Sequence, residues 1–256
     1  EPTIVQYVKW LKEILSGSLG YSILEDKYVL PLLSDKLETT LTLSILSLIF
    51  SLLVAIPLGT ISAMKRGSKT DEIIRVLTAI TIATPPFWIG LLIINLTSTQ
   101  FNWVPPLFYR PLHIDPLTNL TFMVFPVLTI VLTTSSILIR LLRSMILEEL
   151  SRDYVRTAYA KGLTSYSVIL IHVIRNASIP IITMCGFFFS AVLGGAVVVE
   201  QVFNLPGLGS AIVVAILSRD TPMLLGIIIG LSVIMCIWIL IIDLLYMLID
   251  PRIKYS

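Results

Sequence analysis

The sequence predicts an all-α integral membrane protein, a polytopic bundle of helices. Of its 256 residues, 56% are hydrophobic and 13% are charged, and the mean hydropathy is +0.93, whereas a soluble domain carries about 25% charged residues. The chain also contains five uncharged runs of at least 22 residues, and a membrane helix needs about 20 apolar residues. Composition and run length both indicate a chain that crosses a membrane several times.

Residues 1–36 carry both signs of charge and precede the first uncharged run. Apolar side chains recur there at helical spacing, which predicts a short amphipathic helix. They are Val5, Val8, Leu11 and Leu15. We therefore expect an external segment over residues 1–36, followed by a transmembrane domain over residues 37–256.

The five uncharged runs give five expected transmembrane helices. They lie at 39–64, 76–99, 116–139, 176–199 and 221–242. The Thr84-Pro85-Pro86 step falls inside the second of them, and proline both removes a backbone donor and clashes with the preceding turn. This helix is therefore expected to be kinked or interrupted there.

One further uncharged run, 201–218, is too broken to form a span. Pro206-Gly207-Leu208-Gly209 interrupts it, and the residues that follow are too few to cross. Residues 200–222 are expected to form an external re-entrant or surface hairpin, in which Gly207 and Gly209 permit tight turns. Three charged residues could pair across this hairpin: Glu200, Arg219 and Asp220.

Lys and Arg are distributed unevenly about these spans. The loop 65–75, the segment 140–175 and the tail after residue 250 together hold twelve, whereas the opposite set of loops holds six. Since cytoplasmic loops carry the excess of Lys and Arg, residues 147–177 are expected in the cytoplasm and Glu1 outside. A chain that starts outside must be carried across, so we expect one further helix upstream and six in the native chain.

Residues 147–177 form a polar, basic island between two apolar runs, with Gly162 as a permissive backbone position in its middle. A first helical stripe is formed by Leu147, Leu150, Tyr154 and Ala158. A second is formed by Tyr166, Leu170, Val173 and Ala177. Two short amphipathic helices need a partner, either a protein socket with an apolar floor and an acidic rim or a surface of anionic lipid.

The island resembles the EAA loop, through which ABC importer permeases dock onto their ATP-hydrolysing subunit. Residues 154–163 read Tyr-Val-Arg-Thr-Ala-Tyr-Ala-Lys-Gly-Leu, and residues 172–177 read His-Val-Ile-Arg-Asn-Ala. Three further motifs follow in order: Glu200-x-x-Phe203-x-x-Pro206-Gly207-Leu208-Gly209, Arg219-Asp220-x-Pro222 and Asp250-Pro251-Arg252. The resemblance covers nearly the whole chain and is to the B-type permease of the dipeptide, oligopeptide and nickel branch.

The chain also departs from the general EAA pattern. With Gly162 aligned, Arg156 and Thr157 stand where that pattern begins with Glu and Ala, and Arg175 stands where many permeases carry Pro. These departures fit the peptide and nickel branch and argue against a sugar or phosphate importer.

The resemblance implies a type I ABC importer permease, with the MetI-like fold, in the inner or plasma membrane of a prokaryote. It implies four kinds of partner: a C-type permease, two ATP-binding subunits, an external substrate-binding protein and membrane lipid. ATP and Mg are expected on the ATP-binding subunits, and no cofactor on this chain. The implied ATPase-coupling residues are Tyr154, Arg156, Ala158, Ala160, Lys161, Gly162 and Leu163. The implied external gate comprises Glu200, Phe203, Pro206, Gly207, Gly209, Arg219 and Asp220.

The expected function is to form the translocation path for dipeptides or oligopeptides. Polar residues within the spans are the candidates for its lining, although most such residues bond within the helix bundle. They are Thr133, Thr134, Ser135 and Asn95, with Ser136 and Ser190 beside them. Import of nickel or a metal–metallophore complex by the same architecture is one alternative, and an ion-coupled secondary transporter is another.

Other function classes lack their signals in the sequence. There is no Gly-x-x-x-x-Gly-Lys-Ser/Thr loop to cradle a nucleotide phosphate, and no nucleophile–base set or acid pair that an enzyme would need. The two cysteines and two histidines are isolated, so no metal site is predicted. Ion coupling needs acids inside the membrane, and only Asp243 qualifies. A net charge of +2 gives no nucleic-acid footprint.

Overall fold

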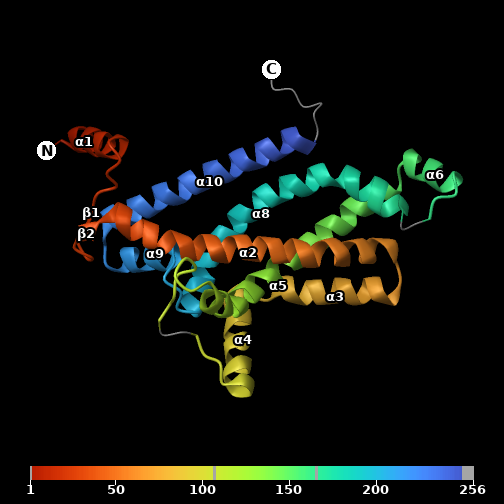
Figure 1. Cartoon of the computed structure of the whole chain (residues 1–256), viewed down its shortest axis with the longest axis horizontal. Coiled ribbons are helices and arrows are strands. Elements are labelled where there is room, and N and C mark those ends of the chain that lie inside the picture. The colour runs from red at the N-terminus through yellow and green to blue at the C-terminus, as the bar shows by residue number, and fades with distance from the viewer. Residues whose placement is uncertain (1, 106–107, 165–166, 250–256) are drawn as a thin grey trace.

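The computed structural model describes residues 2–105, 108–164 and 167–249. Within them the chain is mostly helical, with a short antiparallel β-hairpin near the N-terminus (Figure 1). In chain order the elements are α1 (Thr3–Leu15), β1 (Tyr21–Ser22), β2 (Lys27–Tyr28), α2 (Val29–Met64), α3 (Lys69–Ala83), α4 (Pro86–Phe101), α5 (Pro116–Leu150), α6 (Asp153–Ala160), the π-helix η1 (Val168–Val173), α8 (Ile174–Val202), α9 (Leu208–Leu217) and α10 (Thr221–Ile249).

The long helices α2, α5, α8 and α10 form the bundle. Among the described residues, four helical stretches are long and apolar enough to cross a membrane: Val29–Met64, Pro116–Leu150, Pro180–Val202 and Thr221–Leu245. Figure 1 shows α6 and the α2–α3 turn at one end of the bundle, and α9 with the β-hairpin at the other. The predicted cytoplasmic and external elements thus lie at opposite ends.

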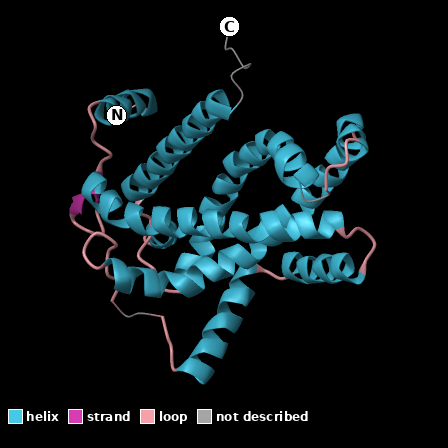
Figure 2. Cartoon of the chain, turned by 45° about the vertical axis from the view of Figure 1, so that its right-hand side comes forward, coloured by secondary structure: helices cyan, strands magenta, loops and turns pink. Residues whose placement is uncertain are grey.

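The remaining expected span consists of two helices. α3 and α4 are bent by 100° relative to each other, and α4 projects from the side of the bundle in Figures 1 and 2. Thr84 ends α3 in an extended conformation and Pro86 begins α4, because a residue before proline is pushed out of the helical region. The interruption predicted at this step is confirmed, and residues 76–99 count as a fifth span only if α3 and α4 are taken together.

Several helices extend beyond their uncharged runs. α2 begins at Val29, so the boundary expected between residues 36 and 37 falls inside a helix, and α5 continues past Arg140 to Leu150. A helix of about 35 residues is about 50 Å long, which exceeds the hydrocarbon core of about 30 Å. The charged ends of α2 and α5 can therefore stand in the headgroup region and in water.

The contact between α2 and α5 is tight. A Cβ atom on Gly59 would lie 2.9 Å from Leu142 Cβ and 3.2 Å from the Ile139 carbonyl oxygen, so the two backbones approach each other closely there. Small residues permit such approaches between membrane helices. They recur every four residues along α2, and all are buried: Ser47, Ser51, Ala55, Gly59 and Ala63.

Replacement of Gly59 by alanine is expected to lower the free energy of unfolding by about 2 kcal/mol, because α5 must move to admit the methyl group. In an open helix the same change stabilises by up to about 1 kcal/mol. Gly194 on α8 is the matched control, since a Cβ atom there meets nothing within 4 Å. Denaturant titration of both purified variants in detergent measures the difference, and equal midpoints would contradict the close packing.

Candidate functional site

α6 is a short helix that folds back onto the bundle. α5 ends at Leu150, and α6 begins at Asp153 after a turn. On its inner side Val155 and Ala158 are buried in an apolar cluster. The other buried members of this cluster come from the ends of α2 and α5 and from η1: Ala63, Ile146, Val168 and Val173.

The predicted first stripe therefore packs against the chain itself. Leu147 and Leu150 belong to α5 and contact this cluster together with Tyr154, whose hydroxyl donates to Glu149 Oε2 at 2.6 Å. A single helix through all four stripe residues is wrong, because the chain turns between α5 and α6. A helix of two turns buries its apolar side against the neighbouring apolar residues of the same chain. Ala158 and Tyr154 therefore hold α6 in place and do not face outward.

The rest of α6 and the turn after it are open to solvent. Tyr159 is 42% exposed and Leu163 is 39% exposed. Tyr159 was not among the predicted coupling residues; it lies at the edge of the buried face, where helical spacing alone does not decide exposure. The other exposed residues of this surface are Asp153, Arg156, Thr157, Ala160, Lys161 and Gly162, with Arg156 lying 3.6 Å from the Asp153 carboxylate. A partner would therefore meet a basic surface with an aromatic ring and a leucine on it.

Gly162 ends α6 in a left-handed conformation, with φ of +80°. The Leu163 N–H donates to the Ala158 carbonyl at 3.3 Å, and the Gly162 N–H donates to the Tyr159 carbonyl at 2.9 Å. This is the Schellman pairing that closes a helix C-terminus. A Cβ atom on Gly162 would meet nothing within 4 Å, so glycine is required there by the backbone alone. The permissive turn predicted at this position is confirmed.

The second half of the predicted loop is described in part. η1 leads directly into α8, and its buried residues Val168 and Val173 lie beneath α6. Tyr166 of the second stripe lies outside the described residues, as does the Asp250-Pro251-Arg252 motif. The described part also leaves out the side chains of Leu170, His172, Arg175, Asn176 and Ala177.

A buried ion pair joins α3 to α5 at the same end of the bundle as α6. The Asp71 carboxylate accepts hydrogen bonds from Arg143 Nε and Nη2, both at 2.8 Å. It also accepts from Ser62 Oγ at 2.6 Å and from the Gly67 N–H at 3.0 Å. One carboxylate thus ties together α2, the α2–α3 turn, α3 and α5. The sequence offers no local signal for this pair, since its members lie 72 residues apart.

Glu200 organises the segment predicted as an external hairpin. It is fully buried near the end of α8, and its carboxylate accepts hydrogen bonds from Thr40 Oγ1 at 2.6 Å and from the Ser210 N–H at 2.8 Å. Thr40 Oγ1 accepts in turn from the Leu208 N–H at 2.8 Å. N–H groups in the first turn of a helix have no partner within it. Glu200 on α8 and Thr40 on α2 therefore cap α9 from outside.

Gly207 and Gly209 are required for space. Neither has a positive φ, so the tight turns predicted at these glycines are not made there. A Cβ atom on Gly207 would overlap the Glu200 carboxylate, and one on Gly209 would lie 2.5 Å from Val197 Cα. The left-handed turn between α8 and α9 is instead made by Asn204, with φ of +53°, a residue type that tolerates this conformation.

The charges predicted to pair across the hairpin serve other purposes. No ion pair joins Glu200, Arg219 and Asp220, all of which the structure describes. Asp220 is buried, accepts from Ser22 Oγ in β1, and caps α10 by accepting from the Met223 N–H at 3.2 Å. Arg219 is exposed and left-handed, with φ of +57°. Phe203 is buried in the core, and Pro206 is half-buried.

Comparison with known proteins decides the family. Residues 55–255 match the family described as binding-protein-dependent transport system inner membrane component. The chain belongs to this family. It is a permease subunit of an ABC importer in the inner membrane, and such a system also includes ATPase and substrate-binding partners.

Relatives and solved structures agree with this assignment. A probable peptide ABC transporter permease protein of Sinorhizobium fredii is 36% identical over 255 residues, covering 100% of this chain and 82% of the relative. The oligopeptide transport system permease protein AppB of Bacillus subtilis is 36% identical over 258 residues, with the same coverage of each chain. An inward-facing structure of the MetNI methionine ABC transporter gives a TM-score of 0.70 at 13% identity, covering 86% of this chain and 97% of that chain. The permease therefore has the MetI-like fold of type I ABC importers.

The polar residues predicted to line a path differ in their surroundings within the permease. Thr134, Ser135 and Ser136 on α5 are buried inside this one chain, so packing between its own helices accounts for them in this conformation. Thr133 and Ser190 are half-buried, and Asn95 on α4 is exposed. Contact with a path between two permeases stays a prediction, and these three residues are the ones that the bundle does not bury.

Replacement of Glu200 by glutamine is expected to lower the free energy of unfolding of the permease by about 2 kcal/mol. The amide keeps the shape but puts an NH2 group, which cannot accept, among the N–H and O–H donors that Glu200 now satisfies. Thermal unfolding of the purified permease measures the loss. Glu148→Gln, on an exposed side chain, is the control, and an equal midpoint for the two variants would show that Glu200 does not cap α9.

Proposed function

We propose that this permease forms part of the translocation path for dipeptides or oligopeptides in an ATP-driven importer. The substrate class is supported by relatives named as peptide and oligopeptide permeases, which are 36% identical over the whole chain. A C-type permease is proposed as the other half of the path, next to two ATP-binding subunits and an external substrate-binding protein. ATP and Mg are proposed to bind to the ATP-binding subunits and not to this chain.

α6 is proposed as the element that an ATP-binding subunit moves. The observation that carries this proposal is the difference between its two sides: Val155 and Ala158 are packed on α5 and η1, whereas Tyr159 and Lys161 are exposed. A partner that grips the exposed side cannot shift α6 without shifting the helices beneath it. Packed interfaces of this kind move between discrete arrangements and do not deform continuously.

The proposed cycle has two states of the helix bundle. ATP binding closes the two ATP-binding subunits and moves α6, which favours the arrangement that is open to the outside and receives the peptide. Hydrolysis releases the subunits and favours the inward-open arrangement. ATP thus acts as a ligand that binds one state better than the other, which is the requirement for any shift of a conformational equilibrium.

Uptake by the reconstituted complex tests the proposed function. Proteoliposomes that contain both permeases, the ATP-binding subunits and the substrate-binding protein are loaded with or without ATP, and the uptake of a labelled peptide pool is measured. Uptake that requires internal ATP is the expected result. Uptake driven by an ion gradient without the ATP-binding subunits would contradict it in favour of a secondary transporter. Uptake of nickel chelates but not peptides would replace the proposed substrate.

A further inference from the structure

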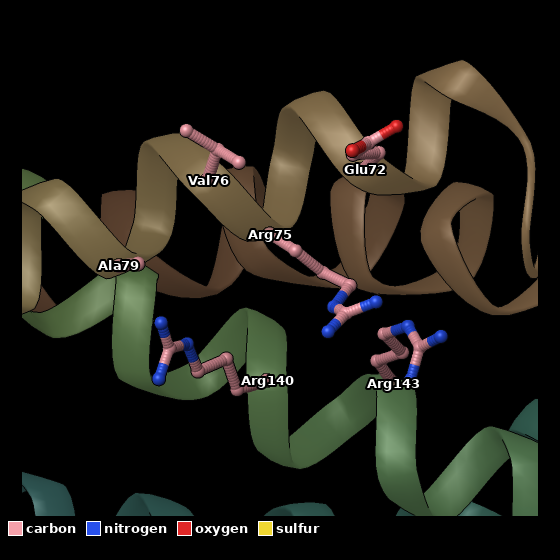
Figure 3. A pocket seen from close by; sticks show the side chains of 6 residues that line it. All are labelled: Glu72, Arg75, Val76, Ala79, Arg140 and Arg143. Atoms are coloured by element: carbon pink, nitrogen blue, oxygen red, sulfur yellow. The ribbon is translucent and has the colours of Figure 1, made fainter.

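A cavity of about 460 Å³ lies between α3 and α5, at the end of the bundle that carries α6. It is lined by Glu72, Arg75, Val76, Ala79, Arg140 and Arg143 (Figure 3). Figure 3 shows Arg75 reaching from α3 toward Arg143 on α5, whereas the Arg140 side chain lies nearer Ala79. Three arginine side chains therefore line one hollow, together with the Glu72 carboxylate.

Two of these arginines have no carboxylate partner. Arg143 is paired with Asp71, but neither Arg75 nor Arg140 takes part in an ion pair within the described ranges. The Arg140 side chain makes a long hydrogen bond from Nε to Thr78 Oγ1, at 3.4 Å. A second cavity of about 600 Å³ also touches Arg75 and Arg143 and adds Arg66, together with the carboxylates of Asp71 and Glu148. In both cavities the arginines outnumber the carboxylates, with only Glu72 against three arginines in the first. This excess of positive charge favours an anion.

The positions of Arg75 and Arg140 along their helices indicate the depth of this site. Arg75 immediately precedes the uncharged run 76–109, and Arg140 immediately follows the uncharged run 116–139. Each is the first charge beyond an apolar stretch, which is the level of the lipid phosphates. The Lys and Arg distribution assigns this end of the bundle to the cytoplasm, where the leaflet is rich in anionic lipid.

The surface of α3 beside the cavity is apolar. Four aliphatic side chains on it are between 52% and 60% exposed: Ile73, Val76, Leu77 and Ile80. A free phosphate ion would gain nothing from such a surface, whereas acyl chains bury it. Arginine is also the side chain that matches phosphate with a two-pronged hydrogen-bond fork.

We propose that the cavity between α3 and α5 binds the phosphate of an anionic phospholipid from the cytoplasmic leaflet, through Arg75 and Arg140. The acyl chains lie along the apolar face of α3. Because the two arginines come from different helices, the bound lipid joins α3 to α5 next to the Asp71–Arg143 pair. The proposal does not depend on which substrate is transported.

Lipid binding to the purified permease complex tests the proposal. The complex in detergent is titrated with short-chain phosphatidylglycerol, phosphatidylcholine or inorganic phosphate, and retained ligands are counted by native mass spectrometry while thermal unfolding is followed in parallel. The test variant is Arg75→Gln with Arg140→Gln. The matched control is Lys65→Gln with Lys69→Gln. It removes the same amount of charge at the same end of the bundle, from residues that do not line either of these two cavities.

Phosphatidylglycerol is expected to bind to the wild type and to the lysine control, and to bind about tenfold more weakly to the arginine variant. If that variant does not accumulate in cells, Arg75→Lys is used in its place, because lysine keeps the charge but cannot form the two-pronged hydrogen bond to phosphate. A several-fold weaker affinity of this variant for phosphatidylglycerol is then the supporting result. Equal binding by all forms would overturn the proposal. So would stabilisation by inorganic phosphate as strong as by the lipid, or loss of a partner subunit from the arginine variant in every lipid, which would assign the arginines to an acidic protein surface.

Discussion

Replacement of Arg143 by methionine is expected to lower the free energy of unfolding of the permease by about 3 kcal/mol, because removing one member of a buried pair leaves the other charge uncompensated. Asp71 is buried, and Arg143 supplies two of its hydrogen bonds at 2.8 Å. Ser62 and the Gly67 N–H still satisfy part of the carboxylate, which keeps the loss below the largest values known for such pairs. Denaturant titration in detergent measures it.

Two comparisons make this result specific. Arg156→Met removes an exposed arginine that lies 3.6 Å from the exposed Asp153, and such surface pairs contribute about 1 kcal/mol or less. Asp71→Asn combined with Arg143→Met should cost less than the two single changes added together, since the second change removes the charge that the first left unpaired. Equal losses for Arg143→Met and Arg156→Met would show that the Asp71–Arg143 pair contributes little to stability.

Replacement of Gly162 by valine is expected to reduce peptide uptake by the reconstituted importer by about tenfold or more while ATP hydrolysis continues. A left-handed residue with a Cβ atom costs about 1–2 kcal/mol, and a β-branched one more, so the turn after α6 must open and the exposed surface at Lys161 and Leu163 must shift. Uptake per ATP hydrolysed is the quantity to measure, because it separates loss of coupling from loss of assembly.

Gly162→Asn is the control that isolates the backbone. Asparagine tolerates the left-handed region, and there is open space around this position, so the asparagine variant should keep most of the coupling even though its side chain is as large as that of valine. If valine and asparagine reduced uptake equally, the effect would come from the surface of the turn and not from its conformation.

The sequence predicts those parts of the fold that depend on one segment at a time. Apolar run length locates α2, α5, α8 and α10, proline chemistry locates the break between α3 and α4, and glycine locates the turn after α6. Each of these is decided by residues that are neighbours along the chain. They fix the membrane-spanning bundle and the position of α6 within it.

The remaining features depend on contacts between distant segments. Helical spacing shows that Ala158 lies on an apolar side of its helix, but it does not show that α5 and η1 cover that side. The same stripe could equally be a surface that binds a partner. Gly209 reads as a turn residue, although its neighbour Val197 on α8 is the reason for its small size. No pattern of neighbouring residues in the sequence indicates the pairing of Asp71 with Arg143. In the candidate sites, the residues are therefore predictable and their roles are not.

α5 has one more consequence for how the permease works. It runs for 35 residues without a glycine, and its one internal proline, Pro126, lies toward the outer end. The stretch from there to Leu150 therefore behaves as a stiff rod. A stretch of about 25 residues is about 37 Å long, so a rotation of about 10° at one end displaces the other by about 6 Å. If α6 is the element that an ATP-binding subunit moves, as proposed, a small tilt imposed there is amplified with distance along α5.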